Sequence, residues 1–343
     1  MKKPNVAILG ATGAVGAEFI TLIEERNFPY ENLKLLASAR SAGTELTVNG
    51  KTYVVEEAKP ESFANIDIAL FAGGSISKTL APEAAKRGAI VIDNSSAFRM
   101  DPEVPLVVPE VNPEDILKHK GIIANPNCST IIMSLGLKPL HDISPIKRIV
   151  VSTYQAVSGA GKEGIEELEN QVKQFIAGEE MTANLLPTGS APKHYPVAFN
   201  LLPQIDVFLD NDYTKEEMKM VHETQKILHD DTIQVVPTTV RVPVYRSHSE
   251  SVLVETEEPV SVEAFKAACE KFPGLQVKDN PAEQIYPMPL YTSNQNDCEI
   301  GRIRKDLYND KGMNFWIVGD QIRKGAALNA LQIAEYLVEK QAF

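Results

Sequence analysis

Short apolar runs alternate with helix-like segments over the first 130 residues of the chain. Residues 14–26 and 77–87 carry apolar side chains at the three- and four-residue spacing of one helix face. Strands of a parallel sheet are buried on both faces, so they appear as continuous apolar runs between such helices. This part of the chain therefore predicts an α/β fold with a doubly wound parallel sheet. The expected strands are residues 6–9, 33–37, 66–71, 89–92 and 121–124.

Longer strands with a different residue composition are expected after about residue 147. Residues 148–157 and 233–245 are rich in Val and Thr, and 251–256 follow the second of these at hairpin distance. Their alternation of apolar and polar positions predicts an antiparallel or mixed sheet that is covered on one face. Residues 181–212 lie between these strands, are rich in Pro, Asn and Leu, and have no clear period. We expect them to form an excursion or a dimer arm.

The end of the chain, residues 325–340, predicts a helix with a wide apolar face. A helix this apolar needs a sheet to cover, so we expect it to return to the first domain. The sequence therefore predicts a Rossmann-type domain of residues 1–127 plus 322–343. A second, α+β domain is expected over residues 128–321.

Composition excludes several kinds of partner. The net charge of −12 argues against nucleic acid and anionic membranes, and no apolar stretch approaches the roughly 20 residues that span a bilayer. The chain starts with MKKPNVAILG, which leads straight into a strand and does not resemble a signal peptide. The three cysteines are far apart, which predicts neither a disulfide framework nor a zinc site, and His222-Glu223 has no further ligand at metal spacing. We expect a cytoplasmic protein without a catalytic metal.

A glycine-rich turn follows the first expected strand and opens the first helix. Its G-x-x-G-x-x-G spacing allows the backbone to approach a pyrophosphate, and the free N–H groups of a helix start favour an anion. Such turns also use glycine for packing alone, but this position in an alternating α/β chain favours a dinucleotide site. The residues expected at the dinucleotide are Gly10, Thr12, Gly13, Ala14, Val15 and Gly16.

The end of the second expected strand favours NADP over NAD. NAD enzymes usually place an acidic residue there to bind the ribose 2′-hydroxyl. This chain has no acidic residue between Leu33 and Thr44, and has Ser38, Arg40 and Ser41 instead. A guanidinium with two hydroxyls suits a 2′-phosphate, although Arg40 could also be a solvated loop residue. We therefore expect NADP as the cofactor, with these three side chains at its 2′-phosphate.

Cys128 stands where another helix is expected to begin. Pro126 favours extended structure before it, Asn127 is a good N-cap, and residues 131–140 are helical in pattern. The unpaired N–H groups and the dipole of a first helical turn lower the pKa of a thiol. The same N–H groups can stabilise a developing oxyanion. Cys128 is therefore a candidate nucleophile.

The other two cysteines lack this context. Cys269 lies in the amphipathic segment 262–272 and fits the common role of a small buried residue. Cys298 lies between polar residues, and we expect it in a loop without a helix start. A thiolate beside a nicotinamide indicates attack on an activated acyl carbon, followed by hydride exchange with the cofactor.

With these features in place, the sequence resembles the aspartate-β-semialdehyde dehydrogenase family over essentially the whole chain, and its short gaps favour the Gram-positive-like branch. The resemblance implies NADPH-dependent conversion of L-aspartyl-4-phosphate into L-aspartate-4-semialdehyde and phosphate through a Cys128 thioester, in lysine, threonine, methionine and diaminopimelate biosynthesis. It also implies a homodimer or homotetramer, with the second domain serving catalysis and dimerisation. The matching motifs are GATGAVG at 10–16, SSAFR at 95–99, NPNCST at 125–130, YQAVSGAG at 154–161, EEMK at 216–219 and RVPVYRSH at 241–248.

The resemblance assigns the chemical steps to three residues. Cys128 matches the family nucleophile, and Gln155 matches the residue that orients the acyl intermediate. His248 matches the general acid/base, and an imidazole with a pKa near neutrality suits that role. The remaining histidines are expected at the surface or in loops.

Further residues match the substrate and cofactor sites of the family. Arg241 matches the arginine that binds the substrate α-carboxylate, and Glu216 matches the residue for its amino group. Lys219 and Arg99 match the phosphate-binding residues. Without the resemblance, Glu216 and Lys219 would be an ordinary helix salt bridge and Arg99 a surface charge. The residues expected near the cofactor in this part of the chain are Ser158, Gly159 and Gln321.

Three other functions are weighed against this one. N-acetylglutamyl-phosphate reductase shares the architecture, but it usually carries a G-C-Y-P-type cysteine motif, and its acylated amine leaves Glu216 little to bind. A non-catalytic NADP sensor would explain the glycine turn but not Cys128, Arg241 and His248 together. A cysteine hydrolase would not explain the glycine-rich cofactor motif.

Overall fold

The computed structural model describes residues 2–343, so residue 1 of the expected first domain lies outside the description. The chain divides into two units: residues up to Asn127 together with Gly325–Phe343, and Cys128–Lys324. The C-terminal return begins at Gly325, whereas we expected it at residue 322. Ile322 and Arg323 donate their backbone N–H groups to Asp320 Oδ1, and these bonds hold them in the second unit.

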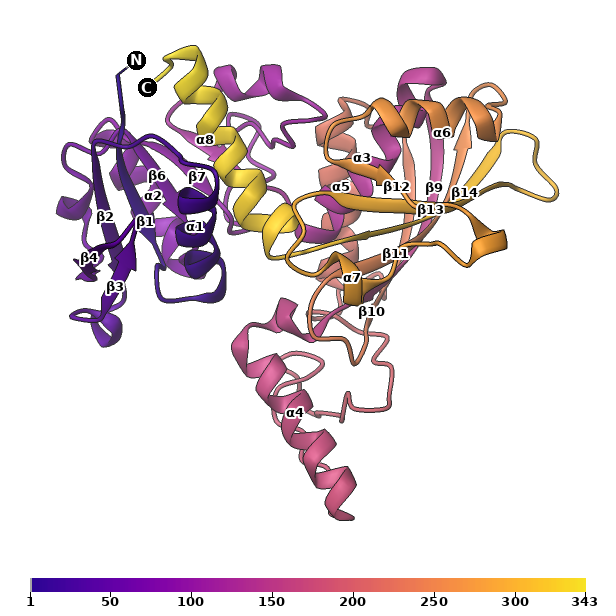
Figure 1. The fold of residues 1–343 in the computed structure, drawn as a ribbon, viewed down its shortest axis with the longest axis horizontal. Coiled ribbons are helices and arrows are strands. Elements are labelled where there is room, and N and C mark those ends of the chain that lie inside the picture. The colour runs from indigo at the N-terminus through magenta and orange to yellow at the C-terminus, as the bar shows by residue number, and fades with distance from the viewer. Residues whose placement is uncertain (1) are drawn as a thin grey trace. The chain divides into compact units, whose positions relative to one another are not determined.

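Six parallel strands form the main sheet of the first unit, in the order β5-β2-β1-β6-β7-β8 (Figure 1). This is the strand order of a Rossmann-type sheet, so the doubly wound parallel sheet is confirmed. The pattern did not predict the two-residue β5 or the small β3–β4 hairpin. The strand bounds are β1 (Asn5–Leu9), β2 (Asn32–Ala37), β3 (Glu45–Val48), β4 (Lys51–Val54), β5 (Glu56–Glu57), β6 (Ile68–Phe71), β7 (Ile90–Asp93) and β8 (Ile122–Ala124).

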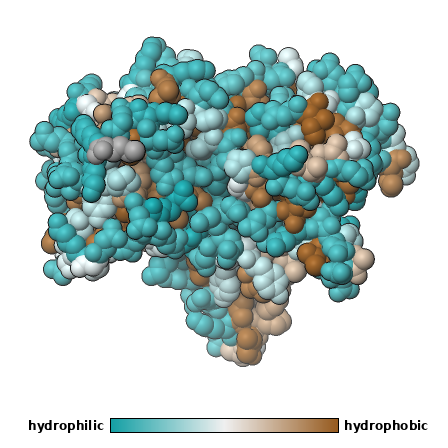
Figure 2. All heavy atoms as spheres, turned by 45° about the horizontal axis from the view of Figure 1, so that its top comes forward, coloured by the Kyte–Doolittle hydropathy of each residue, from teal (hydrophilic) through white to brown (hydrophobic). Residues whose placement is uncertain are grey.

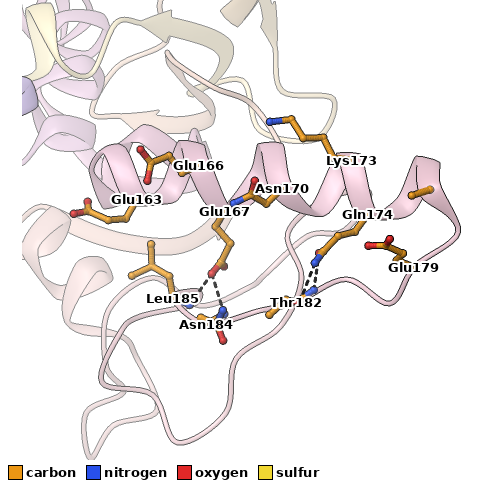
Figure 3. A pocket seen from close by; sticks show the side chains of 11 residues that line it. Glu163, Glu166, Glu167, Asn170, Lys173, Gln174, Glu179, Thr182, Asn184 and Leu185 are labelled. Atoms are coloured by element: carbon orange, nitrogen blue, oxygen red, sulfur yellow. Dashed lines mark hydrogen bonds between the residues drawn. The ribbon is translucent and has the colours of Figure 1, made fainter.

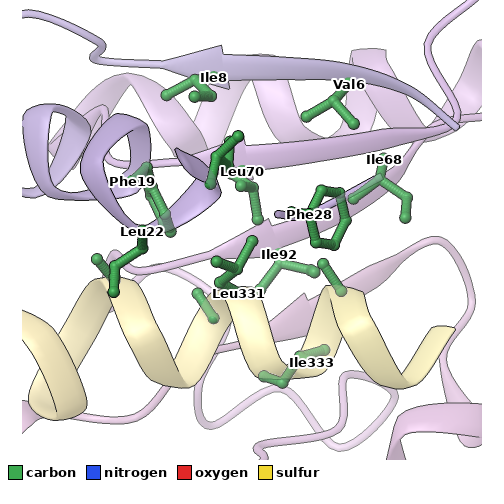
Figure 4. Close-up of a cluster of buried hydrophobic side chains, with 14 of the residues drawn as sticks. Val6, Ile8, Phe19, Leu22, Phe28, Ile68, Leu70, Ile92, Leu331 and Ile333 are labelled. Atoms are coloured by element: carbon green, nitrogen blue, oxygen red, sulfur yellow. The ribbon is translucent and has the colours of Figure 1, made fainter. Parts of the chain in front are cut away.

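Helices cover both faces of this sheet. The helices α1 (Ala14–Glu25) and α8 (Leu328–Lys340) share one buried cluster, in which Leu331 packs near Ile92 and Leu70 (Figure 4). Helix α2 (Ser77–Lys86) packs in a second cluster on the other face. Each fully buried Leu or Ile contributes roughly 1.5–3 kcal/mol. The apolar C-terminal helix therefore completes the core of the first unit.

A mixed six-stranded sheet forms the second unit, in the order β10-β9-β11-β14-β13-β12. Strand β9 is parallel to β10 and antiparallel to β11, and it lies between them. The mixed sheet is confirmed, but the hairpin between residues 233–245 and 251–256 is wrong, because β9 separates the two strands. The bounds are β9 (Ile146–Gln155), β10 (Gln234–Arg241), β11 (His248–Thr256), β12 (Leu275–Val277), β13 (Cys298–Lys305) and β14 (Gly312–Gly319).

Helices α3 (Cys128–Ile143), α5 (Lys215–Leu228) and α6 (Val262–Lys271) pack on one face of the mixed sheet. The opposite face carries half-buried side chains, among them Tyr154 and Trp316, whose rings lie 5.3 Å apart. The shorter helices are η1 (Ala39–Ser41), η2 (Pro60–Phe63), η3 (Gly74–Ile76), η4 (Pro113–Lys118), η5 (Val157–Ala160), η6 (Pro281–Glu283), α7 (Pro289–Thr292) and η7 (Arg323–Ala327).

Helix α4 (Lys162–Ala177) and the irregular segment 178–212 form an arm of the second unit. Glu167 accepts hydrogen bonds from the backbone of Asn184 and Leu185 beside a groove of about 700 Å³ along the helix (Figure 3). The arm carries exposed apolar side chains, which appear as brown atoms at its lower end in Figure 2. They include Phe175, Ile176, Phe199 and Leu201. Within residues 2–343, no helix has the length and apolarity needed to cross a bilayer.

Candidate active site

Three expected site residues meet at one edge of the mixed sheet. Gln155 ends β9 and pairs in register with Arg241, which ends β10. Strand β11 runs antiparallel to β9 and pairs Ser249 with Tyr154, so His248 begins β11 at the same edge. Gln155, Arg241 and His248 are all buried. Strand direction and register therefore place an amide, a guanidinium and an imidazole side by side.

Hydrogen bonds fix the imidazole and the amide. The backbone N–H of Ala156 donates to His248 Nδ1 at 3.0 Å, so the neutral ring carries its proton on Nε2. Gln155 Nε2 lies 3.4 Å from His248 Nε2 and donates to Glu216 Oε1 at 3.3 Å. Thr153 Oγ1 donates to Gln155 Oε1 at 3.0 Å, which sets the orientation of the amide. The imidazole therefore presents an Nε2–H group to this edge.

His248 is neutral in this site. Burial, followed by the charge of Arg241, lowers its pKa to about 3, while Glu216 acts in the opposite direction. Our expectation of a pKa near neutrality is therefore wrong. The sequence motif contains Arg241, but it does not reveal that the two side chains are buried together. An anion bound to Arg241 would offset the positive charge of the guanidinium and so raise the pKa of His248.

Arg241 is positioned to bind an anion. It is buried, its Nη1 donates to the carbonyl of Ala156 at 2.7 Å, and its Nε has no hydrogen-bond partner among the described residues. Burial lowers the pKa of the guanidinium, and the charges of Glu216 and Cys128 oppose that change. Arg241 lines a cavity of about 360 Å³. A planar guanidinium with an unused donor suits a carboxylate.

The first turn of α5 is anchored beside this edge. Thr214 caps the helix: its hydroxyl accepts from Glu217 N at 3.2 Å, and Glu217 Oε2 accepts from Thr214 N at 2.7 Å. Glu217 Oε1 also accepts from the backbone of Thr239 in β10 at 2.9 Å. These bonds hold Glu216 against Gln155 and present Lys219, one turn further on, to the same cavity.

Lys219 forms ion pairs with two carboxylates, at 3.0 Å from Glu216 and 3.1 Å from Asp206. Burial alone would lower the pKa of Lys219, but the two carboxylates outweigh it and the pKa is raised. The expected Glu216–Lys219 pair is thus present on one helix face. Asp206 was not expected, because it lies in a segment without periodicity.

Cys128 is the first residue of α3 and is partly exposed, as a nucleophile at a helix start requires. Its charge acts on Arg241, so the sulfur lies near the edge described above.

Cys269 is buried, which raises its pKa to about 12. Our loop assignment of Cys298 is wrong: it begins β13 and is fully buried, because sheet packing covers a locally polar stretch.

The second-unit residues expected near the cofactor also support the edge itself. A Cβ on Gly159, in η5, would lie 2.8 Å from Arg241 Nη1. Gln321 Oε1 accepts from the backbone N–H of Ser247 at 2.7 Å, and its Nε2 donates to Ser158 Oγ. Ser247 directly precedes His248 and has a left-handed backbone with φ of 75°. Gln321 thus holds a strained residue in place.

The glycine turn of the first unit fits a dinucleotide. Gly10 has φ of 83°, and a Cβ there would lie 2.5 Å from the carbonyl oxygen of Ala72. A Cβ on Gly16 would lie 2.0 Å from the carbonyl oxygen of Gly10. These glycines allow close backbone packing of the turn, and helix α1 begins directly after it at Ala14, where the N–H groups of a first helical turn favour an anion. Arg40 is exposed in η1, directly after β2.

Arg99 lies in the first unit and is buried. Its Nε donates to the carbonyl of Asn125 at 2.9 Å and its Nη2 to the carbonyl of Asn94 at 2.8 Å. These bonds tie it to the loops that follow β7 and β8. Over residues 2–343, no group of three or more His, Cys, Asp or Glu side chains is arranged to hold a metal ion.

Glu250 is a buried carboxyl next to the candidate site. It lies two residues after His248 in β11, is fully buried, and neither of its carboxyl oxygens has a hydrogen-bond partner among the described residues. Burial raises its pKa well above the ordinary 4.5. The folded protein therefore retains a proton that the unfolded chain releases, so the contribution of Glu250 to stability falls as pH rises above 4.5.

We predict that Glu250→Gln stabilises the protein increasingly as pH rises, because glutamine has no proton to retain. The gain over wild type should grow by up to about 1.4 kcal/mol per pH unit above the ordinary glutamate pKa. Urea unfolding at pH 5 and pH 7 measures it. The matched control is Glu258→Gln, an exposed residue just past the same strand. A pH-independent difference between Glu250→Gln and wild type would contradict this account.

Comparison with known proteins identifies the family. A family model for the semialdehyde dehydrogenase NAD binding domain matches residues 5–119, and one for the dimerisation domain matches 137–324. The aspartate-semialdehyde dehydrogenases of Aquifex aeolicus and Bacillus subtilis are 56% and 52% identical, over 98% and 97% of each chain. The Vibrio cholerae aspartate semialdehyde dehydrogenase II complexed with ASA is 46% identical over 99% of both chains, with a TM-score of 0.93.

The fold and the site thus define a semialdehyde dehydrogenase with a nucleotide-binding and a dimerisation domain. Within that class, the chain belongs to the aspartate-semialdehyde dehydrogenase family.

Proposed function

We propose that this protein reduces L-aspartyl-4-phosphate to L-aspartate-4-semialdehyde with NADPH, through a thioester on Cys128. The observation that carries the proposal is the cluster at the sheet edge, where Gln155, Glu216, Arg241 and His248 converge beside a cysteine at a helix start. The names of relatives at 56% and 52% identity, and the Vibrio cholerae structure complexed with ASA, support the substrate.

The first step forms the thioester. The Cys128 thiolate attacks the acyl carbon, a C–S bond forms, and the C–O bond to phosphate breaks, so that phosphate leaves with the bonding electrons. Backbone N–H groups in the first turn of α3 are suited to stabilise the transient oxyanion. Gln155, held by Thr153 and Glu216, is placed to orient the acyl group.

The second step is reduction. When bound, the nicotinamide cofactor would supply the hydride for the thioester carbon. The tetrahedral oxyanion that results would accept a hydrogen bond from His248 Nε2–H; its collapse re-forms the carbonyl and breaks the C–S bond, so that the aldehyde is released and the electron pair returns to the Cys128 thiolate. The lowered pKa keeps the ring neutral, so in the reverse direction the same Nε2–H would stabilise the oxyanion that forms when the Cys128 thiolate attacks the aldehyde carbon.

The remaining charges fit the other groups of the substrate. Arg241 binds the α-carboxylate through its free donors, and Glu216 binds the α-ammonium group. Lys219 and Arg99 bind the phosphate. This arrangement assigns one oppositely charged partner each to the carboxylate and the ammonium group of aspartyl phosphate, and two to its phosphate. It also disfavours an N-acylated substrate, which has no cation for Glu216.

NADP is the proposed cofactor, because Ser38, Arg40 and Ser41 follow β2 in place of an acidic residue. The dinucleotide is proposed to bind at Gly10, Thr12, Gly13, Ala14, Val15 and Gly16, with Ser158, Gly159 and Gln321 toward the nicotinamide. The tight glycine turn that leads from β1 into the start of α1 supports the pyrophosphate position.

We predict that Arg40→Ala raises the KM for NADP roughly 10-fold or more and leaves the KM for NAD unchanged, because one charge-assisted hydrogen bond is lost. Steady-state kinetics with both cofactors measure it. Lys78→Ala, which removes an exposed cation elsewhere in the first unit, is the control. An unchanged NADP to NAD preference in Arg40→Ala would refute the role of Arg40.

We also propose a homodimer or homotetramer that works in the cytoplasm in lysine, threonine, methionine and diaminopimelate biosynthesis. The match to a dimerisation domain over residues 137–324 supports self-association. The half-buried face of the mixed sheet and the apolar arm offer surfaces for it. Cys128, Cys269 and Cys298 form no disulfide in the described part of the chain, which agrees with a reducing compartment.

A substrate comparison tests the proposed function. The purified protein should show continuous reduction of NADP by aspartate semialdehyde only when phosphate is present, and it should not act on N-acetylglutamate semialdehyde. Activity with the N-acetylated substrate alone would replace our assignment with the related reductase. NADP binding without any turnover would indicate a sensor, and cofactor-independent ester hydrolysis would indicate a hydrolase.

A further inference from the structure

Asp206, which lies outside helix α5, forms an ion pair with Lys219 of the substrate cavity. Lys219 has three N–H donors, and two of them engage carboxylates: Glu216 Oε2 at 3.0 Å and Asp206 Oδ2 at 3.1 Å. No other residue in the described part of the chain bonds to the ammonium group. Because the ammonium group is tetrahedral, hydrogen bonds to two fixed carboxylates also set the direction of its third N–H. Both Asp206 and Lys219 line the cavity of about 360 Å³.

Asp206 is itself rigidly placed. Its Oδ1 accepts from the backbone N–H of Val207 at 2.9 Å, and its carbonyl accepts from Gln204 Nε2 at 3.1 Å. Its backbone is left-handed, with φ of 66°, a conformation that Asp tolerates better than most residues. Lys215 N, at the start of α5, donates to the carbonyl of Val207 at 2.8 Å. The carboxylate is therefore anchored to the same helix that carries Lys219.

Glu216, the other carboxylate bonded to Lys219, also contacts the sheet edge. Glu216 Oε1 accepts from Gln155 Nε2, and its charge acts on Arg241 and His248. Asp206 has no such link to the sheet edge; its side chain bonds only Lys219 and Val207 among the described residues. Of the two partners, Asp206 is thus the one whose side chain bonds only Lys219 and the backbone of its own neighbour, Val207.

We propose that Asp206 is a positioning residue: it fixes the Lys219 ammonium group so that its third N–H meets the phosphate of the substrate. This inference rests on the proposed function. The proposal predicts the direction in which phosphate binding changes when Asp206 is removed, because an effect of its charge and an effect of positioning have opposite signs. If Asp206 acted only by its charge, removing it would strengthen phosphate binding. If it positions Lys219, removing it weakens phosphate binding.

The test is the KM for inorganic phosphate in the reverse direction, with aspartate semialdehyde and NADP saturating. Asp206→Ala should raise this KM about 10-fold, as expected for loss of a charge-assisted hydrogen bond that orients the lysine. Asp206→Asn should recover most of the effect, because the amide oxygen still accepts from the ammonium group. The KM values for aspartate semialdehyde and NADP should stay within about two-fold, since neither depends on this contact.

Two controls sharpen the result. Asp210→Ala removes an exposed charge from the same segment without touching Lys219, and it should leave the phosphate KM unchanged. In a Lys219→Met background, Asp206→Ala should have no further effect on phosphate, because the residue acts through the lysine. An unchanged or lowered phosphate KM in Asp206→Ala, additivity with Lys219→Met, or an equal change in every kinetic constant would overturn the proposal.

Failure of the proposed function would be recognised separately. If the wild-type protein shows no phosphate-dependent reduction of NADP, that function is wrong, whatever Asp206 does. Calorimetric titration with inorganic phosphate then decides the role of Asp206. Weaker phosphate binding by Asp206→Ala than by wild type supports positioning, and equal or tighter binding rejects it.

Discussion

Replacing Cys128 by alanine should lower kcat for phosphate-dependent NADP reduction by at least about 10⁴-fold, as is typical when a covalent nucleophile is removed. The residue begins α3 and is partly exposed, and its charge interacts with Arg241. No other side chain of the edge cluster can form a thioester. Steady-state kinetics with aspartate semialdehyde, NADP and phosphate measure the loss.

The control for Cys128 is Cys269→Ala. Cys269 is buried and its pKa is raised to about 12, so its thiolate is inaccessible and this variant should keep the wild-type kcat. The dissociation constant of NADP, measured by fluorescence titration, should be unchanged in Cys128→Ala. Full activity of Cys128→Ala would contradict the thioester mechanism.

Adding a single methyl group at Gly159 should lower kcat/KM for aspartate semialdehyde by about 10²-fold, the typical consequence of shifting catalytic groups by about 1 Å. A Cβ there would lie 2.8 Å from Arg241 Nη1 and 3.3 Å from His248 Cε1. Arg241 cannot retreat freely, because its Nη1 also donates to the carbonyl of Ala156. Steady-state kinetics of Gly159→Ala measure the effect.

Gly189→Ala is the matched control for Gly159→Ala. Gly189 lines the same cavity, but its Cβ would meet only Leu185 Cδ1, at an ordinary 3.8 Å. This variant should retain the wild-type kcat/KM, and both variants should unfold near the wild-type temperature. Equal activity of the two variants would show that Gly159 does not set the positions of Arg241 and His248.

Features that depend on neighbouring residues could be predicted from the sequence. The glycine turn at 10–16 needs only a strand, a positive φ and a helix start, and each is encoded within a few residues. The same holds for Cys128 at the start of α3, after Pro126 and Asn127. Long apolar periodicity likewise predicted α8 and its place against the first sheet.

Features that depend on distant residues could not be predicted in this way. The proximity of residues 233–245 and 251–256 along the chain suggested a hairpin, but β9, some eighty residues earlier, inserts between β10 and β11. Cys298 has polar neighbours in sequence, yet sheet packing buries it completely. Non-local strand pairing therefore decides both outcomes, and no short pattern reports it.

The electrostatics of the site were the least visible in the sequence. The pKa of His248 depends on burial and on Arg241, which reaches it through strand register and not through proximity in the chain. Asp206 reaches Lys219 from an irregular segment whose course is set by backbone bonds to α5. A family resemblance located the charged residues, but the structure was needed to show which of them share a partner.

The central claim is that Cys128 carries the acyl group, and its most direct test is capture of that intermediate. The enzyme, mixed with aspartate semialdehyde and NADP without phosphate, is quenched in acid, digested and analysed by mass spectrometry. We predict that the Cys128 peptide gains one aspartyl group as a thioester, which added phosphate removes. An unmodified Cys128 peptide after NADP has been reduced, or the acyl group on another residue, would contradict the account.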